Sequence, residues 1–424
     1  MSAQTAPAQV QAKRAWKMPV SYLLATLLLA YMAWTAKGDV TVRLKDKAQS
    51  LSIPDIVKPG APILLGLLVV VALVAAWSWF ATLTRRRESR LVAVGTMSLA
   101  ALATVLGFLV FAGTGSSGVL TLTSVLVSTI AISTPLIFGA LSGVVSEHVG
   151  VVNIAIEGDL LVGAFAGVMT ASLFQSSYLG LVAAPIAGAL LGCLLALFSV
   201  KYGVDQIIVG VVLNVLALGL TTFFYGTLMK HSPQTLNTNQ FSLTPIKIPG
   251  LVEIPVIGPV FFNQTLLVYL MYAAVAFLSI YLYRSRWGLR LRACGEHPRA
   301  ADTVGINVNR TRALNTILGS AFAGLGGAFF TLGQGLSFTD NISSGNGYIA
   351  LAAMILGKWN PLGAMGAAIM FGFAEAVAQM LPNVAPRIPS DLVAMIPYVV
   401  TVIAVAGFVG RSRPPAAENI PYVK

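Results

Sequence analysis

Residues 288–308 read GLRLRACGEHPRAADTVGINV and form the longest strongly charged island between the hydrophobic stretches of the chain. Pro298 favours the first turn of a helix, because its missing N–H is not needed there and its φ is already set. Gly305 favours the position just past a helix end, where the backbone turns left-handed. We therefore predict a short helix over 298–304. A helix of about two turns is marginal alone in water, so we expect it to dock on another surface. An ordinary solvated loop is the alternative.

The composition indicates a membrane protein. Of the 424 residues, 56% are hydrophobic and only 10% are charged, and the mean hydropathy is +0.81. A soluble fold cannot bury this much apolar surface, so we predict an all-α fold, a polytopic bundle of transmembrane helices. The net charge of +12 does not indicate nucleic-acid binding, because the basic residues are scattered over many loops rather than gathered on one face.

Apolar runs long enough for a crossing of about 20 residues predict about 10–12 spans. They lie at 22–34, 62–82, 91–112, 119–142, 156–173, 180–200, 206–228, 265–283, 311–333, 346–358, 362–381 and 392–409. The run at 346–358 is too short to cross unaided. We expect it to be a short, broken or re-entrant helix that protein rather than lipid surrounds.

The basic residues predict the orientation of these spans. With the N-terminus in the cytoplasm, 19 of the 27 Lys and Arg residues fall on the cytoplasmic side and 8 on the other, as the positive-inside rule requires. The charged island at 288–308 and both termini are therefore predicted to be cytoplasmic. The loop at 229–264, rich in Pro, Asn and Thr, is then an external irregular segment.

Polar residues at the start of one span are candidates for a gate or pathway lining. The stretch SEHVGVVNIAIEG (146–158) contains Asn153 and Glu157, with Glu147 just before them. A charge at this depth has to face protein or water rather than lipid, and a gate or pathway lining at a broken helix is the functional interpretation. The alternative is a charged loop whose carboxylates brace neighbouring helix ends.

Three further polar residues lie inside the apolar runs. Gln206 and Asn214 are eight residues apart and share one face of a predicted helix. Side-chain amides in such positions typically link helices, and a contact with the transported solute is the alternative. Glu375 lies deep in the run 362–381 and is a candidate pathway residue, unless it pairs with Lys358 or with a neighbouring helix.

The sequence carries none of the common catalytic signatures. It has no G-x-x-x-x-G-K-[ST] loop for nucleotide phosphates, no H-E-x-x-H and no G-x-S-x-G. Its three His residues are far apart, and its two Cys residues lie in different segments, so no metal site is indicated. We therefore predict that the chain is not an enzyme and has no catalytic residues, no metal ligands and no cofactor of its own.

Four stretches in this order carry a family resemblance: SEHVGVVNIAIEG (146–158), DQIIVGVVLNVLALGLT (205–221), GLRLRACGEHPRAADTVGINV (288–308) and GYIALAAMILGKWNPLGA (347–364). Together they resemble the membrane permease subunits of bacterial ABC importers in the branched-chain amino acid, ribose and nucleoside superfamily, nearest to the nucleoside or simple-sugar type. The resemblance implies a permease core at 119–410. An N-terminal extension with two to three spans (1–118) and a cytoplasmic tail (411–424) flank it.

The resemblance also implies a function. The chain would form the translocation path of an ATP-driven importer in the bacterial plasma membrane, for a nucleoside or a related sugar-containing solute. The predicted helix at 298–304 would be the coupling helix that enters a cleft of a separate ATPase subunit, and that subunit would bind the ATP and Mg. The implied coupling residues are Glu296, Pro298, Arg299, Ala300, Ala301, Asp302 and Gly305.

The same resemblance implies several partners. They are the ATPase, a second and non-identical permease subunit, the membrane lipid, and an extracytoplasmic substrate-binding lipoprotein that docks on outer loops such as 229–264. A secondary carrier driven by an ion gradient is the alternative function, in which Glu157 and Glu375 bind protons or cations. The predicted docking helix counts against a carrier, which has no ATPase to contact.

Overall fold

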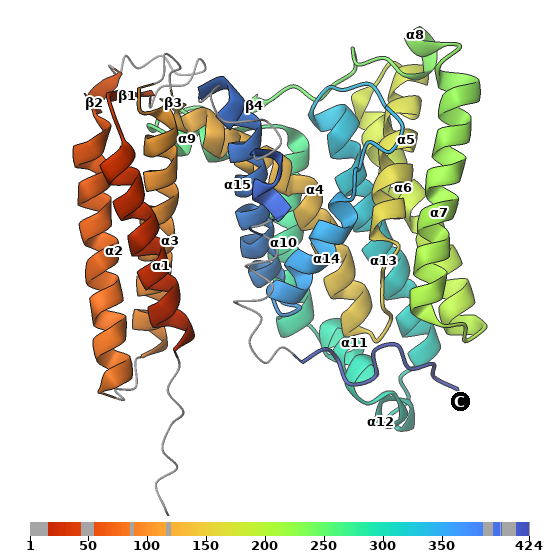
Figure 1. Cartoon of the computed structure of the whole chain (residues 1–424). Helices are drawn as coiled ribbons and strands as arrows, with labels where there is room; N and C mark the ends of the chain where they lie inside the picture. Colours follow the sequence, from red (N-terminus) through yellow and green to blue (C-terminus); the bar gives the residue numbers. More distant parts are fainter. Residues whose placement is uncertain are drawn as a thin grey trace, which may run out of the picture. The chain divides into compact units, whose positions relative to one another are not determined.

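A computed structural model of the protein (Figure 1) describes residues 16–43, 55–84, 89–115, 120–384, 393–398, 400 and 413–423. Within these ranges, ten helices are long and apolar enough to cross a membrane. This confirms the predicted all-α bundle of transmembrane helices. Most of the run predicted at 392–409 lies outside the described residues.

The chain forms two compact units, which we describe separately. The first comprises Met1–Lys45, Ser52–Leu122 and Met380–Val393, and the second comprises Asp46–Leu51, Thr123–Gln379 and Ala394–Lys424. The division of function between an extension at 1–118 and a core at 119–410 stays a prediction.

Three long helices make up most of the first unit: α1 (Lys17–Thr35), α2 (Gly60–Leu83) and α3 (Arg90–Gly113). Leu29 and Leu64 are fully buried where these helices pack together, whereas other large apolar side chains of the helices are exposed. Helices that are apolar on all sides are typical of membrane spans, because their outer faces contact lipid.

A small sheet connects the ends of these helices, and the sequence analysis did not predict it. Strand β1 (Asp39–Arg43) pairs antiparallel with β2 (Ile56–Pro59) and parallel with β3 (Leu120–Thr121). Arg43 Nη2 lies 2.7 Å from Asp55 Oδ2, and this hydrogen-bonded guanidinium lowers the pKa of the Asp55 carboxyl. Strand pairing therefore links the described residues that follow α1 to those that precede α2.

The second unit contains the remaining long helices. They are α4 (Leu122–His148), α5 (Ile156–Leu173), α6 (Ser177–Ala196), α7 (Gln206–Phe224), α10 (Leu266–Arg284), α13 (Val308–Ala328) and most of α15 (Pro361–Val384). Three of these, α6, α7 and α13, continue into π-helical turns at Leu197–Lys201, Tyr225–Met229 and Phe329–Gly333. The bounds agree with the predicted spans to within a few residues, except that α4 continues past its predicted end at 142.

Glycines allow α5, α6 and α13 to pack backbone against backbone. A Cβ atom at Gly163 would lie 2.1 Å from the carbonyl oxygen of Gly324, and one at Gly188 would lie 2.3 Å from that of Ser320. Close approach of this kind stabilises membrane helix pairs through van der Waals contact. These three helices therefore form one closely packed group within the second unit.

The loop at 229–264 contains short elements: α8 (Pro233–Leu236), β4 (Ile246–Lys247), α9 (Ile257–Phe262) and β5 (Asn263–Gln264). β4 pairs antiparallel with β5. The side chain of Asn237 bonds both backbone groups of Phe338, donating to its oxygen at 2.9 Å and accepting from its nitrogen at 2.6 Å. The loop is thereby attached to the segment that follows α13.

Three shorter helices complete the second unit. α14 (Asn346–Leu356) has 11 residues and a length of about 16 Å, against about 30 Å for the bilayer core, so it is the short helix that the sequence predicts. α11 (Arg286–Glu296) and α12 (Pro298–Thr303) follow α10. Figure 1 shows α11, α12 and the tail at 413–423 at the same end of this unit.

Candidate functional site

The candidate site begins at the break between α4 and α5, where residues 149–155 are not helical. Backbone groups in such a segment need partners inside the protein, and two amides of α7 supply them. Gln206 Oε1 accepts a hydrogen bond from Val152 N at 2.7 Å. Asn214 accepts from Gly158 N and donates to Ile154 O, both at 2.8 Å. Both amides therefore link helices, as the sequence analysis favoured.

Asn153 lies in the middle of the break and is fully buried. Its Oδ1 accepts from Ala155 N at 3.0 Å, just before the first turn of α5, and its Nδ2 donates to Ser142 Oγ of α4 at 3.0 Å. One side chain therefore holds both helices that flank the break. This is a bracing role for Asn153.

Glu157 of α5 holds the start of α14. Its carboxylate accepts hydrogen bonds from Ser343 Oγ at 2.5 Å, Gly345 N at 2.8 Å and Gly347 N at 2.6 Å. Free N–H groups and the helix dipole make a helix N-terminus a favourable place for an anion. The structure thus gives Glu157 the helix-end bracing role that the sequence analysis kept as the alternative to a gate.

Glu147, in the last turn of α4, holds the other end of α14. Its Oε2 accepts a hydrogen bond from Trp359 Nε1 at 2.5 Å. Trp359 and Lys358 form the turn between α14 and α15, and both have a positive φ, +55° and +57°, which is uncommon for residues other than glycine. The two carboxylates on either side of the break therefore fix both ends of the short helix.

Glu375 is not part of this arrangement. It is half-buried on α15, and its Oε1 accepts a hydrogen bond from Gln379 Nε2 at 3.2 Å, one turn away on the same helix. Within the described residues it forms no ion pair with Lys358. Of the five predicted pathway residues, the structure brings Asn153, Gln206 and Asn214 to one segment and Glu157 next to it, and leaves Glu375 apart.

The charged island forms two helices, of which the sequence predicted only the second. α12 begins at Pro298, and Gly305 follows its end with φ +85°, as expected from these two residues. α11 was missed, because its alternation of basic and apolar residues has no strong start or stop signal. Ser285 caps it by accepting from Gly288 N at 2.9 Å.

The side chains of α12 do not all face outward. Ala301 is only 3% exposed, so its place in the predicted contact surface is wrong, because it faces the protein and anchors the helix. Arg299, Ala300 and Thr303 are exposed. Val304, just past the helix, is 74% exposed, and these four residues, with the exposed Glu296 and Gly305, belong to the surface that another chain could contact.

The tail at 413–423 joins this region to the break. Arg312 of α13 is buried, and its guanidinium donates to the carbonyl oxygens of Ile420 at 2.7 Å and Ala417 at 3.3 Å. Ala417 N in turn donates to Gly295 O of α11 at 2.8 Å. Gly150 of the break leaves the space that Arg312 occupies, since a Cβ there would lie 2.7 Å from Nη2.

Two side chains of the tail each contact a carboxyl group of another segment, Glu147 of α4 or Asp302 of α12. Glu418 shares a hydrogen bond with Glu147, and burial raises the pKa of Glu418 to about 7. Tyr422 lies beside Asp302 of α12, and its partial burial and the hydrogen bond with that carboxylate raise the pKa of Tyr422. The tail therefore contacts both the break and α12. Nothing local in its sequence signals this, because its partners lie more than a hundred residues away.

Within the ranges that the structure describes, no three His, Cys, Asp or Glu side chains gather where they could hold a metal ion. The arrangement instead offers mechanical connection. The short helix α12, the break between α4 and α5, and the half-length helix α14 are joined by hydrogen bonds.

Comparison with known proteins identifies relatives of this arrangement. The family model described as branched-chain amino acid transport system / permease component matches residues 125–405. The chain is 40% identical over 307 residues to the guanosine ABC transporter permease protein NupQ of Bacillus subtilis, covering 70% of this chain and 95% of the relative.

Two proteins of Lactococcus lactis are also similar. The chain is 38% identical over 314 residues to its nucleoside ABC transporter permease protein NupC, with 72% and 98% covered. It is 26% identical over 296 residues to NupB, also a nucleoside ABC transporter permease protein, with 68% and 80% covered. No solved structure matches the chain.

The role of Glu157 can be tested by Glu157→Gln. The amide keeps the shape but loses the charge, and it presents an NH₂ group to hydrogen-bond donors. We expect the free energy of unfolding to fall by about 3 kcal/mol, the order expected for hydrogen bonds to a buried charged acceptor. The melting temperature of the purified protein in detergent reports this loss. Glu375→Gln is the matched control and should melt like the parent, and equal melting of all three proteins would contradict the bracing role.

The docking of the tail should depend on pH through Glu418. Because its pKa in the folded protein is raised to about 7, above the ordinary value of about 4.3, the protonated form stabilises docking, and this stability is lost as the pH rises through about 7. Limited proteolysis of the tail should therefore be faster at pH 8 than at pH 6, relative to Glu418→Gln measured at the same pH. A parent-to-variant ratio that does not change with pH would contradict this.

Proposed function

Since the chain belongs to the family of permease components of branched-chain amino acid transport systems, we propose that it is the membrane permease subunit of an ATP-driven importer for nucleosides. The observation that carries this proposal is the similarity to NupQ and NupC, which extends over 95% and 98% of their lengths. The family match at 125–405 includes the break, α12 and α14, so these three elements belong to the shared region, whereas the tail at 413–423 lies beyond it.

The proposal gives α12 the role of the coupling helix. Its exposed residues Arg299, Ala300 and Thr303, with Val304, offer a small surface at the end of the second unit where α11 and the tail also lie. A separate ATPase subunit, which binds ATP and Mg, would receive this surface in a cleft. The buried Ala301 keeps the helix attached to its own chain while the ATPase moves it.

The tail offers a route for this movement to reach the membrane helices. Displacement of α12 acts on Tyr422 through Asp302, and on the tail backbone through α11, since Gly295 O accepts from Ala417 N. The tail is fixed to α13 by Arg312 and to Glu147 by Glu418. Glu147 holds the turn between α14 and α15, so the short helix would shift with α12.

The partners follow from the same proposal. NupB and NupC are two different nucleoside permeases of one organism, and the chain is similar to both, which supports a second, non-identical permease subunit. A substrate-binding lipoprotein would dock outside the membrane on the loop at 229–264. The termini and α12 would then be cytoplasmic, in the plasma membrane of a bacterium.

The proposed solute path does not run along the polar residues of the break. Asn153, Gln206 and Asn214 already form hydrogen bonds with other groups of the protein, so few of their donors and acceptors remain for a nucleoside. Glu375, with one local hydrogen bond, stays the candidate pathway residue. If it lines the path, Glu375→Gln changes uptake while the protein level and melting temperature stay those of the parent.

Transport in proteoliposomes tests the proposed function. Vesicles that contain the chain, its ATPase and its second permease, with ATP enclosed and the binding protein outside, should accumulate radiolabelled guanosine. A non-hydrolysable ATP analogue in place of ATP should stop uptake, whereas an ionophore should leave the initial rate unchanged. Unlabelled glucose, added as a competitor, distinguishes a nucleoside from a simple sugar. Uptake driven by an ion gradient without ATP would make the chain a secondary carrier.

The coupling role of α12 is tested by Ala300→Glu. The added carboxylate would be buried unpaired in the ATPase cleft, which costs several kcal/mol. Since about 1.4 kcal/mol is a tenfold change, we expect ATP-driven uptake to fall by more than about tenfold. Membrane insertion should persist, because Ala300 is exposed in this chain.

The matched control is Asn309→Glu, which adds the same charge at an exposed position of α13 outside α12. It should keep most of the uptake. Undiminished uptake in Ala300→Glu, with both proteins present at equal level, would remove α12 from the contact with the ATPase.

A further inference from the structure

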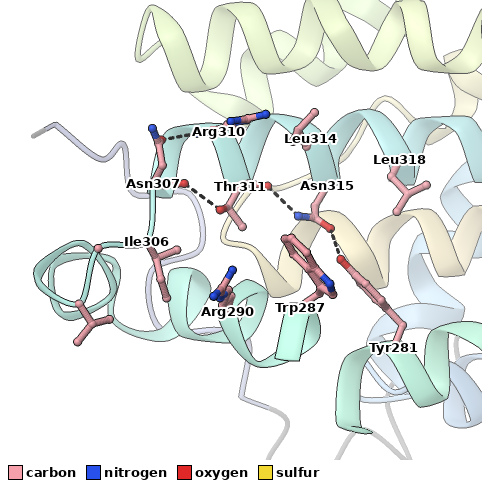
Figure 2. A pocket seen from close by; sticks show the side chains of 12 residues that line it. Tyr281, Trp287, Arg290, Ile306, Asn307, Arg310, Thr311, Leu314, Asn315 and Leu318 are labelled. Carbon is pink, nitrogen blue, oxygen red and sulfur yellow. Dashed lines mark hydrogen bonds between the residues drawn. The ribbon is translucent and has the colours of Figure 1, made fainter. Parts of the chain in front are cut away.

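A cavity of ≈ 710 Å³ lies beside α12, between α10, α11 and α13 (Figure 2). Its lining starts at the loop after α12, with Val304 and Gly305, and continues along α13 as far as Leu318. Of its lining residues, only Val304 and Gly305 also belong to the surface that another chain could contact. Its two ends differ in chemistry, and this difference indicates the kind of ligand that fits.

The end near α12 is basic. Arg290 of α11 and Arg310 of α13 line it together with Asn307, and the described lining contains no acidic residue. Figure 2 shows Arg290 reaching from α11 toward α13. Its Cζ lies 5.4 Å from the centroid of the Trp287 ring, which holds the guanidinium in place by a cation–π contact. In the part of the chain that the structure describes, neither arginine forms an ion pair. The charge is free for an anion.

The other end is apolar and lies within a membrane span. Leu314 and Leu318 follow Arg310 at intervals of four residues, so the three side chains share one face of α13. Leu314 is 56% exposed although it belongs to the candidate span Val308–Gly333. The distance from Arg310 to Leu318 along the helix is about 12 Å. A ligand that fills the cavity therefore has to be charged at one end and apolar at the other.

The polar groups at the deep end are already satisfied by each other. Tyr281 Oη donates to Asn315 Oδ1 at 3.3 Å, and Asn315 Nδ2 donates to Thr311 O at 2.8 Å, as the dashed lines in Figure 2 show. A ligand at this end of the cavity therefore does not need polar groups to satisfy Tyr281 or Asn315. Trp287, 66% exposed at the basic end, is the residue type enriched where membrane helices meet the headgroup layer.

We propose that this cavity binds an anionic phospholipid of the cytoplasmic leaflet. Its phosphate lies between Arg290 and Arg310, and one acyl chain lies along Leu314 and Leu318. Basic pockets between membrane helices on the cytoplasmic side bind lipid headgroups in this way. The inference rests on the proposed function in one respect only, the cytoplasmic placement of this end. A free phosphate has no apolar part to contact Leu314 and Leu318, and these two residues lie within the span, where a soluble ATPase does not reach.

A lipid bound beside α12 would affect the position of that helix. The cavity is bounded by α11 and by the loop that joins α12 to α13, so a lipid there fixes the position of the coupling helix relative to α13. Loss of the lipid leaves the short helix α12 attached only through its own chain. Anionic lipid would therefore support coupling as well as binding.

Native mass spectrometry of the purified full chain tests the proposal, with phosphatidylglycerol and phosphatidylcholine of the same acyl chains as probes. We expect the parent to retain phosphatidylglycerol in preference. Replacing both arginines, Arg290→Gln with Arg310→Gln, should weaken its binding by about 30-fold, the loss expected when two basic charges near an anionic lipid are removed. Leu318→Trp, which fills the deep end without changing the charge, should weaken binding as well.

The matched control removes two charges from the same segment outside the cavity, Arg284→Gln with Arg286→Gln; both residues are exposed and neither lines the cavity. It should bind phosphatidylglycerol like the parent. Equal retention of the two lipids by the parent, or equal weakening in both double variants, would overturn the proposal.

A photo-cross-linking residue at position 314 in intact membranes provides a second readout that needs no purified variant. Capture of phosphatidylglycerol supports the proposal, and capture of the ATPase subunit overturns it. Neither experiment depends on transport. A failed guanosine uptake assay with intact lipid binding would reject the proposed function alone, and the reverse result would reject only the lipid site.

Discussion

Two buried carboxylates, Glu147 and Glu157, hold the two ends of a helix that is too short to cross a membrane. α14 has 11 residues. The free N–H groups at its start and the polar groups of the turn after it need hydrogen-bond partners, because a bilayer offers none. Glu157 accepts hydrogen bonds from N–H groups at the start of α14, and Glu147 accepts one from the Trp359 ring just after the end of α14. Both carboxylates flank the break between α4 and α5. Residues beside this break therefore supply the hydrogen-bond partners that the two ends of α14 need.

The break in turn depends on α7 and on the tail. Gln206 and Asn214 fix its backbone, and Gly150 makes room for Arg312, whose buried guanidinium is satisfied by carbonyl oxygens of the tail. Irregular backbone inside a membrane protein is tolerated only where protein or water satisfies it. Gln206 and Asn214 satisfy the break, and a second set of hydrogen bonds, from Arg312 to the tail and from Tyr422 of the tail to Asp302, connects α12 to α13.

Much of this architecture could be predicted from the sequence, because hydropathy alone locates membrane spans and because Pro298 and Gly305 mark the ends of α12 locally. The contacts could not. Glu157 meets Gly347 across 190 positions, and no local pattern specifies such a partner, so a bracing carboxylate and a gate looked alike. Ala301 was placed on the contact surface, because a two-turn helix alone does not show which face it buries. The pairing of β1 with β2 and β3 was missed for the same reason: short strands in a polar segment carry too little periodicity.

We propose that this chain does not act alone: α12 contacts an ATPase, and the membrane path needs a second permease. Purification of the tagged full chain in mild detergent, followed by identification of the proteins that accompany it, tests this most directly. We predict recovery of a nucleotide-binding subunit and a second, non-identical permease, with the ATPase lost from the complex in the Ala300→Glu variant. Recovery of the chain alone, still able to transport guanosine in liposomes under an ion gradient, would make the chain a secondary carrier instead.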